Sequence, residues 1–244
     1  MSNDQNDQLV LICGASASGK SASLRNIRNQ EKWLYMNTEA GKRLPFKNKF
    51  RSARVDDPMQ VLEAFDYAIA HKDDVDGIIV DSLTFLMEMY ESKYVLTSAN
   101  TMRSWSDFQQ YFKTLMQDKV IKFGKPVIFT AHTLKTLNEN TGEYEVSVPI
   151  KGALKNNGVE AYFSCVVAAK KLPLKELVDY KNDMLNITEE DKLVNYKHVF
   201  QTKITKTTTG ERIRSPMGLF SREETYIDND VQILLDHLNT FYSE

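Results

Sequence analysis

The sequence predicts an α/β fold, in which a mainly parallel, twisted sheet is flanked by helices, with a β-hairpin edge and a small helical insertion. Short apolar runs alternate along the chain with stretches of helical periodicity, as in sheets built from crossover connections. A phosphate-binding loop, G-x-x-x-x-G-K-S, joins the first apolar run to the next helical stretch. The 244 residues suffice for one sizeable core, and we expect a single domain over residues 1–244.

The composition is that of an ordinary globular protein, with 42% apolar and 26% charged residues. The net charge of −2 excludes a protein that is basic throughout, although it leaves local basic patches open. Cys13 and Cys165 both lie in apolar runs and are expected to be core residues of a reducing compartment. Residues 1–8 are polar and acidic, unlike a signal peptide. No apolar run approaches the roughly 18 residues that a helix needs to span a membrane. We therefore expect a cytoplasmic protein without a membrane segment.

The first element is a strand over the apolar run at residues 9–13, and a helix is expected at residues 22–29. Between them, main-chain N–H groups and the start of the helix are expected to hold the phosphates of a nucleotide. Lys20 would reach the β- and γ-phosphates and Ser21 would hold Mg²⁺. The alternative is an ordinary Gly/Ser turn. The expected nucleotide-binding residues are Gly14, Ala15, Ser16, Ala17, Ser18, Gly19, Lys20, Ser21 and Ala22.

A second strand is predicted at residues 33–37, and Glu39 follows it directly. At this place a carboxylate is a candidate to orient or deprotonate the water that attacks the γ-phosphate. The alternative is a solvated loop carboxylate. A basic, irregular stretch follows at residues 41–54, and residues 56–58 then open a helix with one apolar face.

The next buried strand, residues 77–81, ends in Asp81, which is expected to organise Mg²⁺ together with Ser21. Aromatic and aliphatic residues between 105 and 121 have helical spacing and are expected in the core. Another strand, residues 125–132, ends in Thr130 and His132, which are candidates to sense the γ-phosphate. A histidine at a strand end is equally often a hydrogen-bonded structural residue.

The second half of the chain carries further strand signals. Residues 134–148, which contain an Asn-Glu-Asn-Thr-Gly turn, predict a hairpin or loop, and residues 163–169 predict a buried strand. Residues 172–197 are charged and compatible with helix, and are interpreted as an insertion at the edge of the domain. A strand at residues 199–206 and a C-terminal helix at residues 230–242 complete the expected order.

This layout resembles the RecA-like recombinase core of P-loop NTPases over roughly residues 8–220. The match is carried by residues 14–21, Glu39, the Asp81-Ser82 pair and the polar strand end at residues 130–132, and a Gly152-Ala153-Leu154-Lys155 segment is similar to the family's short helix after its second DNA-binding loop. The resemblance implies that Glu39 is the catalytic base. His132 stands where ring helicases of the superfamily have a histidine.

Only eight residues precede the first predicted strand, and we expect neither the N-terminal polymerisation element of RecA nor its large C-terminal domain. The chain is therefore most similar to the short RecA-like ATPases of tailed bacteriophages, which act in single-strand annealing and recombination. That similarity implies ATP and Mg²⁺ as cofactors, a homo-oligomeric ring or filament, and single-stranded DNA and a phage single-strand-binding protein as partners. The cell would be the bacterial host.

The resemblance also implies two DNA-facing loops, at residues 90–104 and 133–151. The first offers Lys93, Tyr94 and Arg103, and the second offers Lys135, Tyr144 and Lys151, a mixture of cations and aromatic rings that suits a single strand. Solvated loop charge is the alternative. RecA-like ATPases often complete the site from a neighbouring subunit, and the candidates here for such a trans finger are Lys203, Lys206, Arg212 and Arg214.

The sequence thus predicts Mg²⁺-dependent ATP binding and hydrolysis coupled to single-stranded DNA binding in phage-type recombination or annealing. A small-molecule kinase remains an alternative, with residues 41–54 as an Arg-rich lid that carries Arg43, Arg51 and Arg54. A nucleotide-dependent assembly switch with little turnover is a further alternative, with residues 172–197 as its partner surface.

Overall fold

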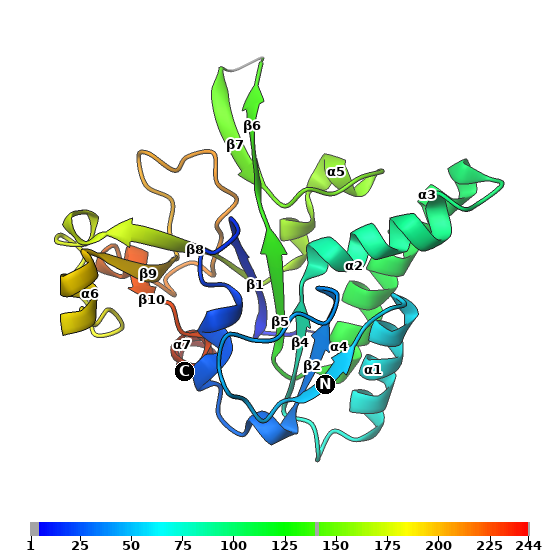
Figure 1. Ribbon diagram of the computed structural model, residues 1–244, viewed down its shortest axis with the longest axis horizontal. Coiled ribbons are helices and arrows are strands. Elements are labelled where there is room, and N and C mark those ends of the chain that lie inside the picture. Colours follow the sequence, from blue (N-terminus) through cyan, green and yellow to red (C-terminus); the bar gives the residue numbers. More distant parts are fainter. Residues whose placement is uncertain (1–4, 140–141, 244) are drawn as a thin grey trace.

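The computed structural model describes residues 5–139 and 142–243. Residues 1–4 of the polar start and Asn140 and Thr141 of the predicted turn lie outside the described residues. Within these ranges, eight strands form one sheet in the order β10-β9-β8-β1-β5-β4-β2-β3 (Figure 1). The strands from β8 to β3 in this order all run parallel. Their bounds are β1 Leu9–Gly14, β2 Trp33–Asn37, β3 Arg51–Arg54, β4 Gly77–Asp81, β5 Val127–His132 and β8 Cys165–Pro173.

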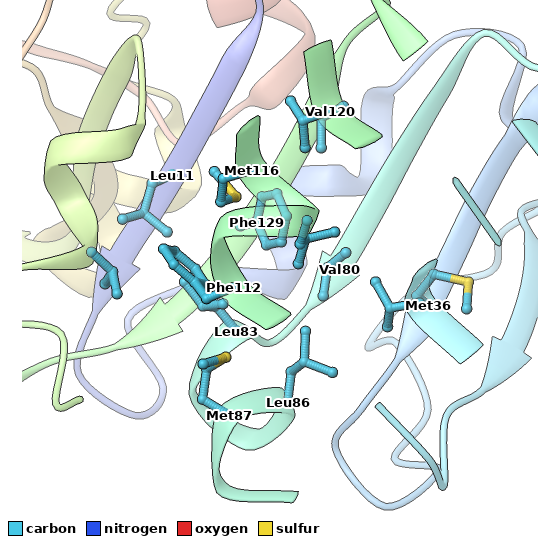
Figure 2. Close-up of a cluster of buried hydrophobic side chains, with 14 of the residues drawn as sticks. Leu11, Met36, Val80, Leu83, Leu86, Met87, Phe112, Met116, Val120 and Phe129 are labelled. Carbon is cyan, nitrogen blue, oxygen red and sulfur yellow. The ribbon is translucent and has the colours of Figure 1, made fainter. Parts of the chain in front are cut away.

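Helices cover both faces of this sheet, as predicted. Alternate residues of β1 divide between two cores, because successive side chains of a strand point to opposite faces. The larger core packs against four helices, and Figure 2 shows part of it, with Leu11 and Phe129 of the sheet close to Phe112 and Met116. These helices are α1 Met59–Ala70, α2 Leu83–Tyr90, α3 Thr101–Thr114 and α4 Val120–Phe123. The second core lies under α7, Val231–Ser243, which confirms the predicted C-terminal helix.

Two antiparallel strands complete the other edge of the sheet: β9, Tyr196–Gln201, pairs with β8, and β10, Tyr226–Asp228, pairs with β9. The predicted hairpin also forms, from β6, Leu134–Asn138, and β7, Glu143–Ser147. It is a separate two-stranded sheet that projects from the end of β5 (Figure 1). A short helix, α5, Leu154–Asn157, follows it.

Several predicted bounds are wrong. The helix expected at residues 22–29 is a 3₁₀ helix over Ser21–Asn26. Its serines explain the difference, since the Ser23 hydroxyl donates to the Lys20 carbonyl at 2.5 Å and so competes with an α-helical backbone. The stretch at residues 41–54 is not irregular throughout, because β3 lies within it. The strand expected at residues 199–206 is displaced to β9, which leaves Lys203 and Lys206 in the following loop.

Residues 172–197 connect β8 to β9, so their position at the sheet edge agrees with the prediction. Their helical content does not: besides a 3₁₀ turn at Leu174–Glu176, the segment holds a single six-residue helix, α6, Glu189–Val194. The first predicted DNA-facing loop is also mostly helical. Helix α2 runs on through a π turn at Glu91–Val95, and only residues 96–100 separate it from α3.

Candidate functional site

The ends of β1, β2, β4 and β5 meet at one edge of the sheet, because these strands are parallel and neighbouring. Ligands of open α/β sheets bind at the carboxyl ends of the strands. A cavity of about 600 Å³ lies at this edge. Its lining includes residues 16–22 of the phosphate-binding loop together with Glu39, Asp81 and His132. The fold therefore brings the four predicted catalytic side chains, Lys20 among them, to one cavity.

The phosphate-binding loop leaves β1 at Gly14 and is tightly packed there. A Cβ atom on Gly14 would lie 2.5 Å from the Ser18 hydroxyl and 2.7 Å from the carbonyl oxygen of Ala169, so only glycine fits. Gly19 has a φ of +101°, which an L side chain rarely adopts. Gly14 and Ala15 also line a second cavity of about 460 Å³.

The Lys20 side chain is held inside the loop. Its ammonium group donates to the carbonyl oxygens of Gly14 and Ala15, each at 2.8 Å, and the residue is only 6% exposed. Burial lowers the pKa of Lys20, and the nearby carboxylates of Glu39 and Asp81 act in the opposite direction. A buried ammonium group that is held by loop carbonyls can bind a strongly anionic ligand such as a phosphate chain.

Asp81 ends β4 and is 2% exposed. Tyr35 of β2 donates its hydroxyl to one carboxylate oxygen at 2.8 Å, and Thr130 of β5 donates its hydroxyl to the other. Burial and the Asp81 carboxylate raise the pKa of Tyr35, so its hydroxyl keeps its proton. Ser21 lines the same cavity. A buried carboxylate and a serine hydroxyl are oxygen donors of the kind that Mg²⁺ prefers, so these residues fit the cation that the loop implies.

Glu39 and His132 lie together at the carboxyl ends of strands β2 and β5. Nε2 of His132 lies 3.4 Å from one carboxylate oxygen of Glu39, and the Lys42 ammonium group donates to the other at 3.3 Å. The Glu39 side chain is 11% exposed. The Phe85 and His132 rings make an edge-to-face contact, with their centroids 5.5 Å apart. This arrangement holds a carboxylate and an imidazole at the cavity, where they can orient a water molecule.

The far wall of the cavity contains residues that sequence reasoning missed. Nδ1 of His198, on β9, lies 2.9 Å from the Ser18 carbonyl oxygen and so holds the loop. The Arg25 guanidinium donates to the carbonyl oxygen of Asn229 at 2.9 Å. Lys197 is ion-paired with both Asp191 of α6 and Asp228 of β10, at 3.0 and 3.1 Å. The insertion thus contributes to the wall, which no local motif indicates.

The candidate trans-finger residues differ in their contacts. Arg212 is ion-paired with Glu160 at 3.3 Å, Arg214 donates to the Ala161 carbonyl, and Lys203 donates to the Phe220 carbonyl. Lys206 is exposed, and of these four it alone has no side-chain hydrogen bond or ion pair to the rest of the described chain. It lies in the loop between β9 and β10.

The candidate DNA contacts lie on the π turn after α2, on α3, and on or just after the hairpin. Lys93 is ion-paired with Asp57 at 2.7 Å, and Tyr94 donates to the same carboxylate. Arg103 is exposed in the first turn of α3. On the hairpin, the Lys135 ammonium group lies 4.3 Å above the Tyr144 ring, which is 55% exposed. Lys151 is paired with Glu91 at 2.8 Å. The hairpin pair therefore presents a cation and an aromatic ring together at the surface.

A mainly parallel sheet, a glycine-bounded phosphate loop and a buried carboxylate at the neighbouring strand end define a P-loop nucleotide-binding domain. The chain belongs to the AAA domain family, whose model matches residues 6–210. The match begins before β1 and includes the loop, Glu39, Asp81, His132 and the hairpin. No curated protein matches the chain. Among the helices of the described ranges, none has the length and apolar character needed to cross a membrane.

Proposed function

We propose that this chain is a Mg²⁺-dependent ATPase that couples hydrolysis to single-stranded DNA binding. One observation carries the proposal: Lys20, Ser21, Glu39, Asp81 and His132, which lie far apart in the sequence, all line one cavity of about 600 Å³. Each has the chemistry that its part of the reaction needs. Phage-type recombination or annealing, with a single-strand-binding protein as partner, is the setting that the resemblance to RecA-like ATPases implies.

In this proposal the loop amides and Lys20 bind the triphosphate, and Ser21 with Asp81 would hold Mg²⁺, which when bound would neutralise phosphate charge. Glu39 takes a proton from water as the water oxygen bonds to the γ-phosphorus. The bond from that phosphorus to the bridging oxygen breaks, and ADP and phosphate leave. His132, 3.4 Å from Glu39, orients the carboxylate and contacts the γ-phosphate.

The DNA and oligomer parts of the proposal rest on the surface. Lys135 and Tyr144 offer a phosphate contact and a stacking platform on the projecting hairpin. Arg103 offers a further exposed cation in the first turn of α3, whereas Lys93 would have to exchange its ion pair with Asp57 for a DNA phosphate. Lys206, unpaired within the described chain, is the favoured trans finger in a homo-oligomer.

The kinase alternative loses two of its three lid arginines, whereas the third, Arg43, lies outside β3 and lines the cavity. Its lid was expected at residues 41–54, but Arg51 and Arg54 belong to β3, which is hydrogen-bonded to β2 along its whole length. A strand fixed in the central sheet cannot swing over a substrate as a lid does.

The test is ATP turnover with and without single-stranded DNA, followed by phosphate release, for the wild type, Glu39→Gln and the double variant Lys135→Ala/Tyr144→Ala. We expect DNA to raise turnover in the wild type. Glu39→Gln should lower turnover about 10²- to 10⁴-fold while nucleotide still binds, and the hairpin variant should keep basal turnover but lose the DNA response. If single-stranded DNA leaves the ATP turnover of the wild type unchanged at every salt concentration, the proposed coupling of hydrolysis to DNA binding is contradicted. Tight ATP binding with negligible turnover would favour the assembly switch instead.

A further inference from the structure

The carboxylate of Asp81 is held from both neighbouring strands. Tyr35 reaches it from β2 at 2.8 Å and Thr130 reaches its other oxygen from β5. All three residues are buried, with exposed fractions of 4% for Tyr35, 0% for Thr130 and 2% for Asp81. A carboxylate has about four acceptor positions, so two donors leave acceptor capacity for a further ligand.

We infer that Tyr35 is a positioning residue for the metal site, because its hydroxyl fixes the Asp81 carboxylate in the orientation that serves a Mg²⁺-nucleotide. The inference rests on the nucleotide site of the proposed function, and it requires neither hydrolysis nor DNA.

The nature of the two donors supports this role. Tyr35 and Thr130 are neutral hydroxyls, and within the described residues no lysine, arginine or histidine is ion-paired with Asp81. A cationic partner would cancel the negative charge that attracts a divalent cation. Neutral donors instead fix the carboxylate and leave its charge in place, as the outer partners of metal ligands commonly do.

The ring and the hydroxyl of Tyr35 have separable roles. The ring stacks on Phe50 with centroids 5.9 Å apart and packs in the second core, which phenylalanine would do as well. The hydroxyl makes a specific bond to Asp81. Replacing Tyr35 by phenylalanine therefore removes the hydrogen bond and retains most of the packing. Because Tyr35 also lines the cavity, a direct contact with the nucleotide is the competing explanation.

The experiment measures binding of a fluorescent ATP analogue at a series of Mg²⁺ concentrations and in the absence of divalent metal. We expect Tyr35→Phe to raise the Mg²⁺ concentration for half-maximal binding roughly tenfold, the lower end of the effect of losing an outer partner of a metal ligand. Affinity without metal should not change. Phe50→Leu is the matched control, since it disturbs the ring stack but keeps the hydroxyl, and it should leave the Mg²⁺ dependence at the wild-type value.

Combining variants tests whether Tyr35 acts on Mg²⁺ binding through Asp81. In an Asp81→Asn background, Tyr35→Phe should have no further effect on Mg²⁺ dependence, because the group that it positions has lost its charge. Thr130→Val removes the other donor to Asp81 and should shift the Mg²⁺ dependence in the same direction. If thermal unfolding shows that Tyr35→Phe does not fold, Thr130→Val tests the inference in its place.

Three results would overturn the inference: a wild-type Mg²⁺ dependence in Tyr35→Phe, an equal loss of affinity with and without metal, or an additive effect in the Asp81→Asn background. The second would assign Tyr35 to the nucleotide itself. A wild type that binds Mg²⁺-nucleotide but neither hydrolyses it nor responds to DNA would contradict the proposed function and still allow this test.

Discussion

Lys20→Met is expected to separate folding stability from nucleotide binding. In the ligand-free protein the buried ammonium group makes two hydrogen bonds of 2.8 Å to loop carbonyls. Such bonds to a charged group contribute about 1.5–3 kcal/mol each, whereas burying an ammonium group costs several kcal/mol. The pKa of Lys20 is lowered, so the burial cost exceeds the favourable contributions to the charged form. Methionine keeps the apolar stem without the charge.

We therefore expect Lys20→Met to be as stable as the wild type or more stable by up to about 2 kcal/mol, which corresponds to at most about 4–8 °C in Tm for a chain of this size. Nucleotide affinity should fall roughly 10- to 100-fold, because a charge-assisted contact to phosphate is lost. The sign of the pH effect follows from the lowered pKa. The wild type gains stability as pH rises from the folded-state pKa of Lys20 towards its ordinary value of 10.5, so the advantage of the variant should shrink over that range.

The assay is denaturant unfolding of both proteins between pH 7 and pH 10.5 without ligand, with nucleotide binding measured in parallel at pH 7. A variant that is less stable by more than about 2 kcal/mol would refute the reasoning about burial. Wild-type nucleotide affinity in the variant would refute the role of the ammonium group.

Other substitutions probe the catalytic carboxylate, the loop anchor and the sheet. Glu39→Gln should lower the ATP turnover number about 10²- to 10⁴-fold with nucleotide affinity changed by less than about threefold; steady-state phosphate release measures this, and unchanged turnover would remove Glu39 from the mechanism. His198→Leu, which loses the bond to the Ser18 carbonyl, should weaken nucleotide binding by up to about tenfold, and calorimetric titration giving the wild-type affinity would contradict that role. Gly77→Ala should cost at least about 1–3 kcal/mol of stability, because the new Cβ would lie 2.3 Å from the Trp33 ring; a denaturation midpoint within error of the wild type would show that the ring yields freely.

Much of the central sheet could be predicted because its signals are local. The apolar runs that become β1, β4 and β5 are continuous and buried, and β4 and β5 end in the polar residues Asp81 and His132. Parallel strands carry their ends to the same edge, so Glu39, Asp81 and His132 could be placed near the loop from the order of elements alone.

The remainder depends on pairing and packing that a local pattern does not encode. All four residues of β3 are exposed and polar or small, so this strand exists through its pairing with β2 and has no apolar signature. The sequence indicates Tyr35 only as part of the strand at residues 33–37, because its bond to Asp81 depends on the β2–β4 register. His198 reaches the loop only through the antiparallel pairing of β9 with β8, across 180 residues of sequence.

Equilibrium titration of the wild-type chain with ATP, with Mg²⁺ and with the metal chelated, tests most directly whether the cavity beside Lys20 and Asp81 is a nucleotide site. The account predicts one ATP bound per chain, with affinity that falls when Mg²⁺ is removed. Absence of binding in the presence of Mg²⁺, or binding that Lys20→Met and Asp81→Asn leave unaltered, would contradict it.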